Sequence, residues 1–237
     1  MTPNQLIWSL LAPALVLSSC TPEAMDLKTC TSPTMDGHTY EVVQIGEQCW
    51  FAENLRTTEF TDGTPIPAIG PNQLANTKTP ARVINPDLPD HYNTFYNGWS
   101  LLQTKGICPK GWRVPTANEF SELYQYTIST STAPFSQVKG AEFCDPTDWD
   151  FTTTDLEFNR FGFNAQPSGC IALEFNPASH IESSQFTSFW TRFDHIHEDP
   201  SDIANILIVS INEERFLTAC GGIAPDYGLC LRCILDE

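Results

Sequence analysis

The cysteines near the C-terminus have the type and spacing that redox or metal chemistry requires. Cys230 and Cys233 form a C-x-x-C pair. A redox pair of this kind opens a helix after a strand, whereas these two residues lie in an apolar, alternating run that is typical of a terminal strand. No second C-x-x-C pair completes a zinc ribbon. The sequence therefore favours structural disulfides over redox or metal chemistry at these positions.

Two further segments contain candidate metal ligands. His195 and His197 would lie on one face of a strand, where they could bind Zn²⁺, but no third ligand is identifiable and H-E-x-x-H is absent. Ca²⁺ takes about six to eight oxygen ligands, and a second segment offers carboxylates without the spacing of an EF-hand loop. These carboxylates are Asp145, Asp148, Asp150 and Asp155. Surface loops are the favoured interpretation of both segments.

Composition limits the class of partner. The 237 residues carry 29 Asp and Glu against 12 Lys and Arg, which gives a formal net charge of -17. Such a chain repels phosphate backbones, so we expect no nucleic-acid partner, and cations or neutral ligands suit it better. The sequence lacks a G-x-S-x-G elbow and a phosphate-binding glycine loop. We therefore expect no catalytic residue and no cofactor.

The N-terminus has the pattern of an export signal. Residues 6–17 are apolar over about twelve positions, too short to span a bilayer of roughly 30 Å but right for a signal peptide. Leu17-Ser18-Ser19-Cys20 follows and resembles a bacterial lipobox, although MTPNQ before the apolar run lacks Lys and Arg. The sequence predicts a signal peptide at 1–19, lipidation at Cys20 and a tether at 20–35. The alternative is a buried N-terminal helix followed by a structural cysteine.

The cysteine count fits export to an oxidising compartment. Assigning Cys20 to the lipid leaves eight of the nine cysteines, an even number. Eight cysteines allow about a hundred pairings, so the residues alone leave the connectivity open. The disulfide candidates are Cys30, Cys49, Cys108, Cys144, Cys170, Cys220, Cys230 and Cys233.

Alternating apolar runs predict the strands that must position these groups. A hairpin is expected at residues 35–40 with its turn at Asp36-Gly37. A second hairpin is expected from the two β-rich runs on either side of Gly46. The remaining strand predictions are residues 41–45, 48–51, 203–211 and 229–235.

One helix is expected at residues 117–126, where Thr116 is the N-cap and Glu119 completes a capping box. Residues 61–89 contain six prolines and predict a long ordered or semi-ordered loop, of the kind that usually carries variation or a binding surface. Residues 127–134 predict a Ser/Thr-rich loop. Few helices and many short strands favour an α+β domain with an antiparallel sheet.

Several motifs follow one another along residues 36–235. They are Asp36-Gly37-x-x-Tyr40, the block Val43–Leu55 with Trp50 and Asn54, Tyr96-Asn97-x-Trp99, the block Cys108–Glu119, the block Phe161–Gly169, and Leu231-Arg232-Cys233-Ile234. Together they resemble the Fibrobacter succinogenes major paralogous domain, which is common in surface and secreted proteins of Bacteroidetes and Fibrobacteres. The chain departs from the pattern at residues 189–192 and in an insertion-like segment at 220–230.

The resemblance implies one domain over residues 36–237. Cys108 and Cys233 both lie in family motifs, so it implies a disulfide between them. Two further pairings are considered with it, Cys144 with Cys170 and Cys220 with Cys230.

The Trp112–Glu119 block also resembles the strand-to-helix turn of formylglycine-generating enzymes and other C-type-lectin-like domains. This likeness implies a C-type-lectin-like fold with short antiparallel strands, one or two helices and long loops. The Glu-Pro-Asn and Trp-Asn-Asp signatures of sugar-binding lectins are absent, so lectin activity does not follow from the fold. As architecture, Trp112 fills a core, Pro115 fixes the turn and Thr116 caps the helix. The alternative makes Trp112 and Arg113 a ligand platform.

These observations predict a lipid-anchored envelope protein in the outer membrane, on its periplasmic face or at the cell surface. Its disulfide-bonded domain would be a non-catalytic binding or adhesion module for a glycan or a surface protein, using the proline-rich loop and exposed aromatic side chains. The alternative is a thiol- or metal-dependent enzyme related to sulfatase-modifying enzymes, built around Cys220, Cys230 and Cys233 or around the pair His195 and His197. A purely structural role in the envelope is a third hypothesis.

Overall fold

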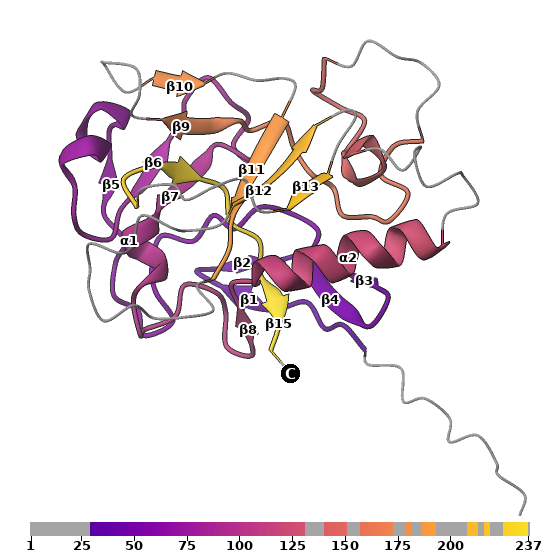
Figure 1. The fold of residues 1–237 in the computed structure, drawn as a ribbon. Helices are drawn as coiled ribbons and strands as arrows, with labels where there is room; N and C mark the ends of the chain where they lie inside the picture. The colour runs from indigo at the N-terminus through magenta and orange to yellow at the C-terminus, as the bar shows by residue number, and fades with distance from the viewer. Residues whose placement is uncertain are drawn as a thin grey trace, which may run out of the picture.

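The computed structural model describes residues 29–130, 140–150, 157–172, 179–181, 186–192, 208–212, 216–218 and 225–236. The predicted sites at Cys20, Asp155, His195, His197 and Cys220 lie outside the described residues. Within them, short strands and few helices form an α+β fold, as the sequence predicts (Figure 1).

The described chain begins with two successive β-hairpins, both of which the sequence predicts. The first pairs β1 (Thr34–Met35) with β2 (His38–Thr39). At its turn Asp36 and Gly37 have φ angles of 50° and 72°, the left-handed values that a type I′ turn requires. The second hairpin pairs β3 (Val42–Ile45) with β4 (Gln48–Phe51).

The second hairpin is part of a four-stranded antiparallel sheet. Its order is β3-β4-β15-β8, with β15 at Ile234–Leu235 and β8 at Trp112–Arg113. Trp50 and Phe51 are adjacent in β4, so their side chains point to opposite faces of the sheet. Both are fully buried. The sheet is therefore covered on both faces and separates two hydrophobic clusters.

Two further sheets lie above this sheet in Figure 1. One sheet has the order β10-β9-β14-β7-β6-β5, and the other has the order β11-β12-β13. All their pairings are antiparallel except that of β5 with β6. The bounds are β5 (Ala68–Ile69), β6 (Arg82–Ile84), β7 (Thr94–Asn97), β9 (Cys170–Ala172), β10 (Ser179–Ile181), β11 (Phe186–Trp190), β12 (Ile208–Asn212), β13 (Phe216–Thr218) and β14 (Gly228–Leu229).

The main helix, α2 (Ala117–Thr130), packs against β12 and β13. Its capping box is confirmed: the Glu119 amide donates to Thr116 Oγ1 at 3.2 Å, and the Thr116 amide donates to Glu119 Oε2 at 2.7 Å. The helix runs further than predicted, so the loop expected from Thr127 is wrong for its first four residues. The Thr127 and Thr130 hydroxyls donate to carbonyls of the preceding turn, which satisfies them within the helix.

The proline-rich segment 61–89 is more structured than a long loop. It contains β5, β6 and the 3-10 turn η1 (Pro71–Asn76), in which Leu74 is fully buried. The remaining helical elements are α1 (Gly98–Leu101) and the 3-10 turn η3 (Gly140–Phe143).

The single strand predicted at residues 229–235 is wrong. The chain forms β14 in one sheet, crosses between sheets, and forms β15 in another. The crossing residues are buried on all sides, so their apolar pattern does not identify one sheet face. The strand predicted at 203–211 is observed from Ile208, and its earlier residues lie outside the described ones.

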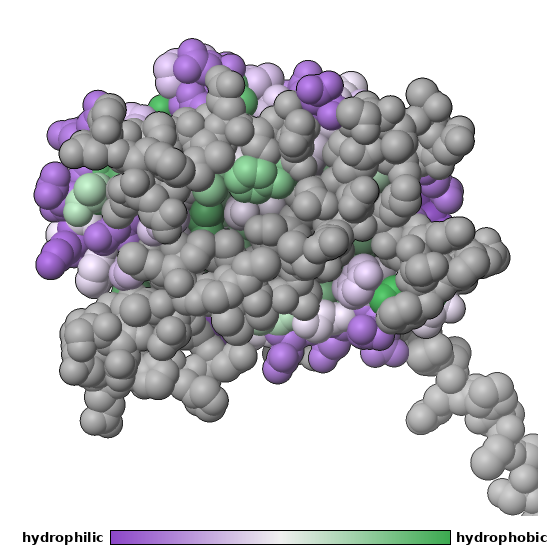
Figure 2. Space-filling model, turned by 45° about the horizontal axis from the view of Figure 1, so that its top comes forward, coloured by the Kyte–Doolittle hydropathy of each residue, from purple (hydrophilic) through white to green (hydrophobic). Residues whose placement is uncertain are grey.

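The described surface is mainly polar. Among the described residues, Leu102 and Tyr126 are the large hydrophobic side chains that are exposed. In Figure 2, the described side chains at the margin of the face are mostly hydrophilic, and apolar ones are visible in smaller areas. No helix in this part of the chain has the length and apolar character to cross a bilayer.

Candidate functional site

The Trp112–Glu119 motif forms part of the molecular frame. Trp112 is 7% exposed and its ring lies 4.9 Å from that of Phe51, centroid to centroid. Arg113 donates to both carboxylate oxygens of Glu119, at 2.8 and 2.5 Å, and to Asp236 at 2.8 Å. These contacts occupy both side chains, which supports the architectural interpretation over a ligand platform.

The charges of this ion pair stabilise each other. Burial acts to raise the pKa of Glu119, but hydrogen bonds from Arg113 and Thr116 outweigh it and lower that pKa below its ordinary value. The hydrogen bond to Glu119 in turn raises the pKa of Arg113. Both groups therefore stay charged at neutral pH and connect the start of α2 to Asp236 near the end of the chain.

Two disulfides are present in the described part of the chain. Cys108 is bonded to Cys233, the pairing that the family resemblance implies, with their Cα atoms 6.0 Å apart. Cys30 is bonded to Cys49 in β4. The first bond joins two residues that are 125 positions apart in the sequence. The second joins the beginning of the described chain to the four-stranded sheet.

Two of the remaining cysteines, Cys144 and Cys230, are buried free thiols. The expected pairings of Cys144 with Cys170 and of Cys220 with Cys230 are therefore wrong. Cys144 lies in the main hydrophobic cluster, whereas Cys170 packs against a separate cluster of Trp190 and Leu229. Burial raises the pKa of the Cys230 thiol to about 12 and also raises that of Cys144, so neither is a ready nucleophile.

Arg232 is the most unusual buried residue of the C-terminal motif. Its guanidinium is fully buried and lies over the rings of Phe163 and Phe189, 4.7 and 5.5 Å from their centroids. Within the described residues no carboxylate pairs with it. Burial lowers its pKa, but an arginine begins from a value above about 12 and stays protonated at neutral pH.

Oxygen atoms from two separate segments surround the Arg232 guanidinium. It donates to Asn54 Oδ1 at 2.8 Å and to the Phe51 carbonyl at 2.9 Å. It also donates to the carbonyls of Phe163 and Asn164, both at 2.7 Å. One buried cation therefore links the end of β4 to the Phe163–Asn164 segment.

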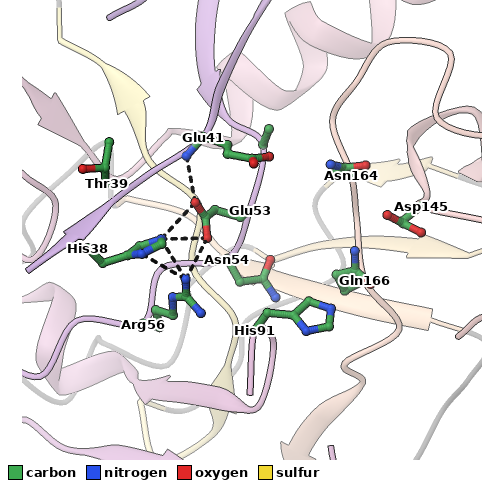
Figure 3. Close-up of a pocket in the computed structure, with 11 residues that line it drawn as sticks. His38, Thr39, Glu41, Glu53, Asn54, Arg56, His91, Asp145, Asn164 and Gln166 are labelled. Atoms are coloured by element: carbon green, nitrogen blue, oxygen red, sulfur yellow. Dashed lines mark hydrogen bonds and ion pairs between the residues drawn. The ribbon is translucent and has the colours of Figure 1, made fainter. Parts of the chain in front are cut away.

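Those two segments form opposite walls of a pocket of about 300 Å³ (Figure 3). This volume is at the lower end of the range for small-molecule sites. The lining is predominantly polar and consists of His38, Thr39, Glu41, Ala52, Glu53, Asn54, Arg56, His91, Asp145, Asn164 and Gln166. Because every lining residue except Ala52 has a polar or charged side chain, the pocket suits a ligand with several polar groups.

The first wall carries a connected group of charges. Glu53 accepts from His38 Nε2 at 2.9 Å and from the Glu41 amide at 2.7 Å. Arg56 Nη2 lies 3.0 Å from His38 Nδ1 and 3.6 Å from Glu53. Figure 3 shows this network on one side, Asp145, Asn164 and Gln166 on the other, and Asn54 between them.

Two buried polar atoms in the pocket lining make no hydrogen bond within the described part of the protein. They are Asn54 Nδ2 and Gln166 Oε1. Asn54 is 1% exposed and Gln166 is 7% exposed. A buried polar atom without a partner costs about 1–3 kcal/mol, so such atoms are rare and require an explanation.

The acidic segment at Asp145 does not form a recognisable calcium site. Asp145 Oδ1 accepts from the amide of Thr147 at 2.8 Å and from its hydroxyl, while Asp148 accepts from Tyr92 at 3.3 Å. Among the described residues, no three His, Cys, Asp or Glu side chains are grouped to hold a metal ion. Asp145 lines the pocket, and the described lining includes neither Asp148 nor Asp150.

Most pocket residues have no distinctive local signal in the sequence. Asn54 belongs to a family motif, and Asn164 and Gln166 lie in the Phe161–Gly169 block, so the resemblance marks them as family positions without assigning a role. Glu53 lies in the same block as Asn54, whereas His38, Arg56 and His91 are polar residues of short hairpins and loops. Only the folded chain brings them together.

The fold and the pocket define a disulfide-bonded α+β domain with a small polar cavity between two linked walls. The chain belongs to the Fibrobacter succinogenes major domain family, whose sequence pattern it matches over residues 43–234. No curated protein and no solved structure matches it.

Proposed function

We propose that this chain is a lipid-anchored protein of the cell envelope whose domain binds a ligand without transforming it. The observation that carries the proposal is the pocket, whose two walls are joined by the hydrogen bonds of Arg232. Walls held in this way present polar groups in a constant arrangement. Preorganised groups of this kind lower the entropic cost of binding.

Export to an oxidising compartment is supported by the cysteines. Disulfides form and persist in such compartments and are rare in the cytosol, and this domain contains two in its described part. The lipobox-like Leu17-Ser18-Ser19-Cys20 supplies the anchor in this proposal. The outer membrane, on its periplasmic face or at the cell surface, is the proposed location.

A C-type-lectin-like arrangement is part of the proposal. The Trp112–Glu119 strand-to-helix turn supports it through the buried Trp112 and the capping box. The pairing of β15 with β8 next to this turn, together with the Cys108–Cys233 bond, brings the end of the chain back to the same place.

The structure gives the thiol-enzyme alternative little support. Cys233 is bonded to Cys108, and Cys230 is a buried thiol that donates to Ser168 Oγ at 3.0 Å. The C-x-x-C residues therefore do not form a redox pair with each other. The metal-enzyme alternative rests on His195 and His197, outside the described residues.

The anchor and the binding role are tested on the full chain expressed in a bacterium with an outer membrane. Mass spectrometry of the purified protein is expected to find a lipidated N-terminal Cys20, and the Cys20→Ala variant is expected to lose the lipid. Glycans and surface proteins incubated with the protein are expected to be recovered chemically unchanged. An unlipidated protein would contradict the anchor, and a chemically altered ligand would contradict the non-catalytic role.

A further inference from the structure

The orientation of the Asn54 amide is determined by its neighbour. Arginine has five N–H donors and no acceptor, so the atom that faces Arg232 Nε at 2.8 Å must be the amide oxygen. The amide nitrogen is therefore the other atom of the group, which is buried without a partner among the described residues, and Asn54 is one of the residues that line the pocket. Asn54 thus offers a buried donor to whatever occupies the pocket.

Gln166 offers the complementary group. Its Oε1 atom is buried in the lining of the same pocket and accepts no hydrogen bond in the described part of the chain. Figure 3 draws Asn54, His91 and Gln166 in the lower part of the view, and all three line the pocket. A ligand there must accept from one amide and donate to the other, and a hydroxyl group does both.

The charges in the pocket indicate a neutral ligand. Glu41, Glu53 and Asp145 place carboxylates in the lining, and the chain has a net charge of -17, so an anion is repelled. Arg56 pairs with Glu53 and offsets one of these charges, so Glu41 and Asp145 leave the lining with an excess of negative charge. The same charge would attract a cation, but the unused donor of Asn54 favours a ligand that brings an acceptor, which a neutral hydroxyl group supplies. Carboxylates remain good acceptors for ligand hydroxyl groups.

We propose that the pocket binds a neutral saccharide, whose hydroxyl groups accept from Asn54 Nδ2 and donate to Gln166 Oε1. This inference rests on the proposed binding function and names its ligand class. The cavity volume of about 300 Å³ suits one or two sugar rings rather than a folded partner. A longer glycan would insert only an end or a short internal segment.

Asn54→Asp is the central variant of the test. It keeps an oxygen for Arg232 and replaces the inward donor by an acceptor, with almost no change in volume. The new carboxylate also lies beside a buried cation, so the fold is expected to persist. Gln166→Met removes the buried acceptor while keeping a side chain of similar length.

The chain supplies a matched control in Asn85. It is 5% exposed, its Nδ2 atom is also buried without a partner among the described residues, and its Oδ1 accepts from the Asp87 amide at 3.1 Å. Asn85 is not among the pocket residues. Asn85→Asp therefore makes the same chemical change at a similar site outside the pocket.

The experiment presents the purified lipidated protein, in detergent, to an array of neutral and acidic oligosaccharides and to a peptide array. The affinity for each bound glycan is then measured by calorimetry. Selective binding of neutral oligosaccharides is expected, with a loss of about tenfold or more in Asn54→Asp and Gln166→Met. Asn85→Asp is expected to bind within about twofold of the parent. Melting temperature and disulfide mapping check that each variant is folded.

The other outcomes separate the two proposals. Peptide binding that Asn54→Asp abolishes would overturn the saccharide and leave the binding function in place. Preference for acidic glycans would also overturn the neutral ligand class. Glycan binding that is unchanged in folded Asn54→Asp and Gln166→Met would overturn the assigned site. Absence of binding on both arrays would contradict the proposed function itself.

Discussion

Arg232 Nε donates a hydrogen bond of 2.8 Å to Oδ1 of Asn54, a residue 178 positions earlier in the chain. This contact connects the C-terminal crossing between sheets with one wall of the polar pocket. Arg232 Nη1 and Nη2 also donate to the carbonyls of Phe163 and Asn164 on the opposite side. The same side chain therefore contributes to folding and to the geometry of the candidate site.

Replacing Arg232 with Met is expected to destabilise the protein strongly. The change removes four hydrogen bonds and leaves Asn54 Oδ1 and three carbonyls buried without their donor. The expected loss in unfolding free energy is about 3 kcal/mol or more, measured by guanidinium denaturation. Lys110 is exposed, so Lys110→Met is a suitable control and is expected to change stability by less than about 0.5 kcal/mol. Equal midpoints for the two variants would contradict the role assigned to Arg232.

Glu119→Gln is expected to show a pH-dependent loss of stability. The folded-state pKa of Glu119 is lowered, so the carboxylate contributes stability above its unfolded value near 4.5 and loses that contribution as the pH falls through the folded pKa. At pH 7 the variant is expected to be less stable by about 1 kcal/mol. The difference should shrink progressively below pH 4.5. Urea denaturation at several pH values measures it.

Glu122 provides the control for this pH profile. It lies on the same helix and accepts from Gln48 Nε2 at 3.1 Å near the surface. Glu122→Gln is expected to change stability by less than about 0.5 kcal/mol over the same pH range. A gap between the parent and Glu119→Gln that stayed constant down to pH 2 would show that the ion pair is not its origin.

The local features of this fold are those that the sequence predicts well. The capping box depends on Thr116 and Glu119, three residues apart, and the first hairpin depends on Asp36 and Gly37. In both cases neighbouring residues decide the conformation through their own hydrogen bonds or backbone preferences. Such features require no information about the rest of the chain.

The features that the sequence does not predict depend on distant segments. Residues 229–235 alternate like one strand, yet they change sheets because both of their sides are buried. The pocket joins His38 and Glu53 to His91 and Gln166, which no spacing rule connects. The Cys144–Cys170 pairing failed for the same reason, since the cluster in which each sulfur packs is decided by the tertiary fold.

The two disulfides are expected to contribute unequally to stability. The Cys108–Cys233 bond spans 125 residues and the Cys30–Cys49 bond spans 19. Because the longer loop restricts the unfolded chain more, its removal is expected to cost about 5 kcal/mol, against about 3 kcal/mol for the shorter one. Denaturation of the two double-alanine variants, each with the other bond intact, measures both values. A larger loss for the Cys30–Cys49 variant would reverse the expected order.

The buried thiols give a direct test of the thiol-enzyme alternative. Burial raises the pKa of Cys230 to about 12 and raises that of Cys144 as well, so little thiolate exists in either at neutral pH. Iodoacetamide at pH 7.5 is expected to leave both residues unmodified in the native protein and to alkylate both in guanidinium. Peptide mass spectrometry reads each site separately, and the denatured sample confirms that both thiols are detectable. Rapid alkylation of Cys230 in the native protein would mean that its thiol is accessible and ionised. A catalytic thiol would then be a better explanation of the C-terminal motif than a structural one.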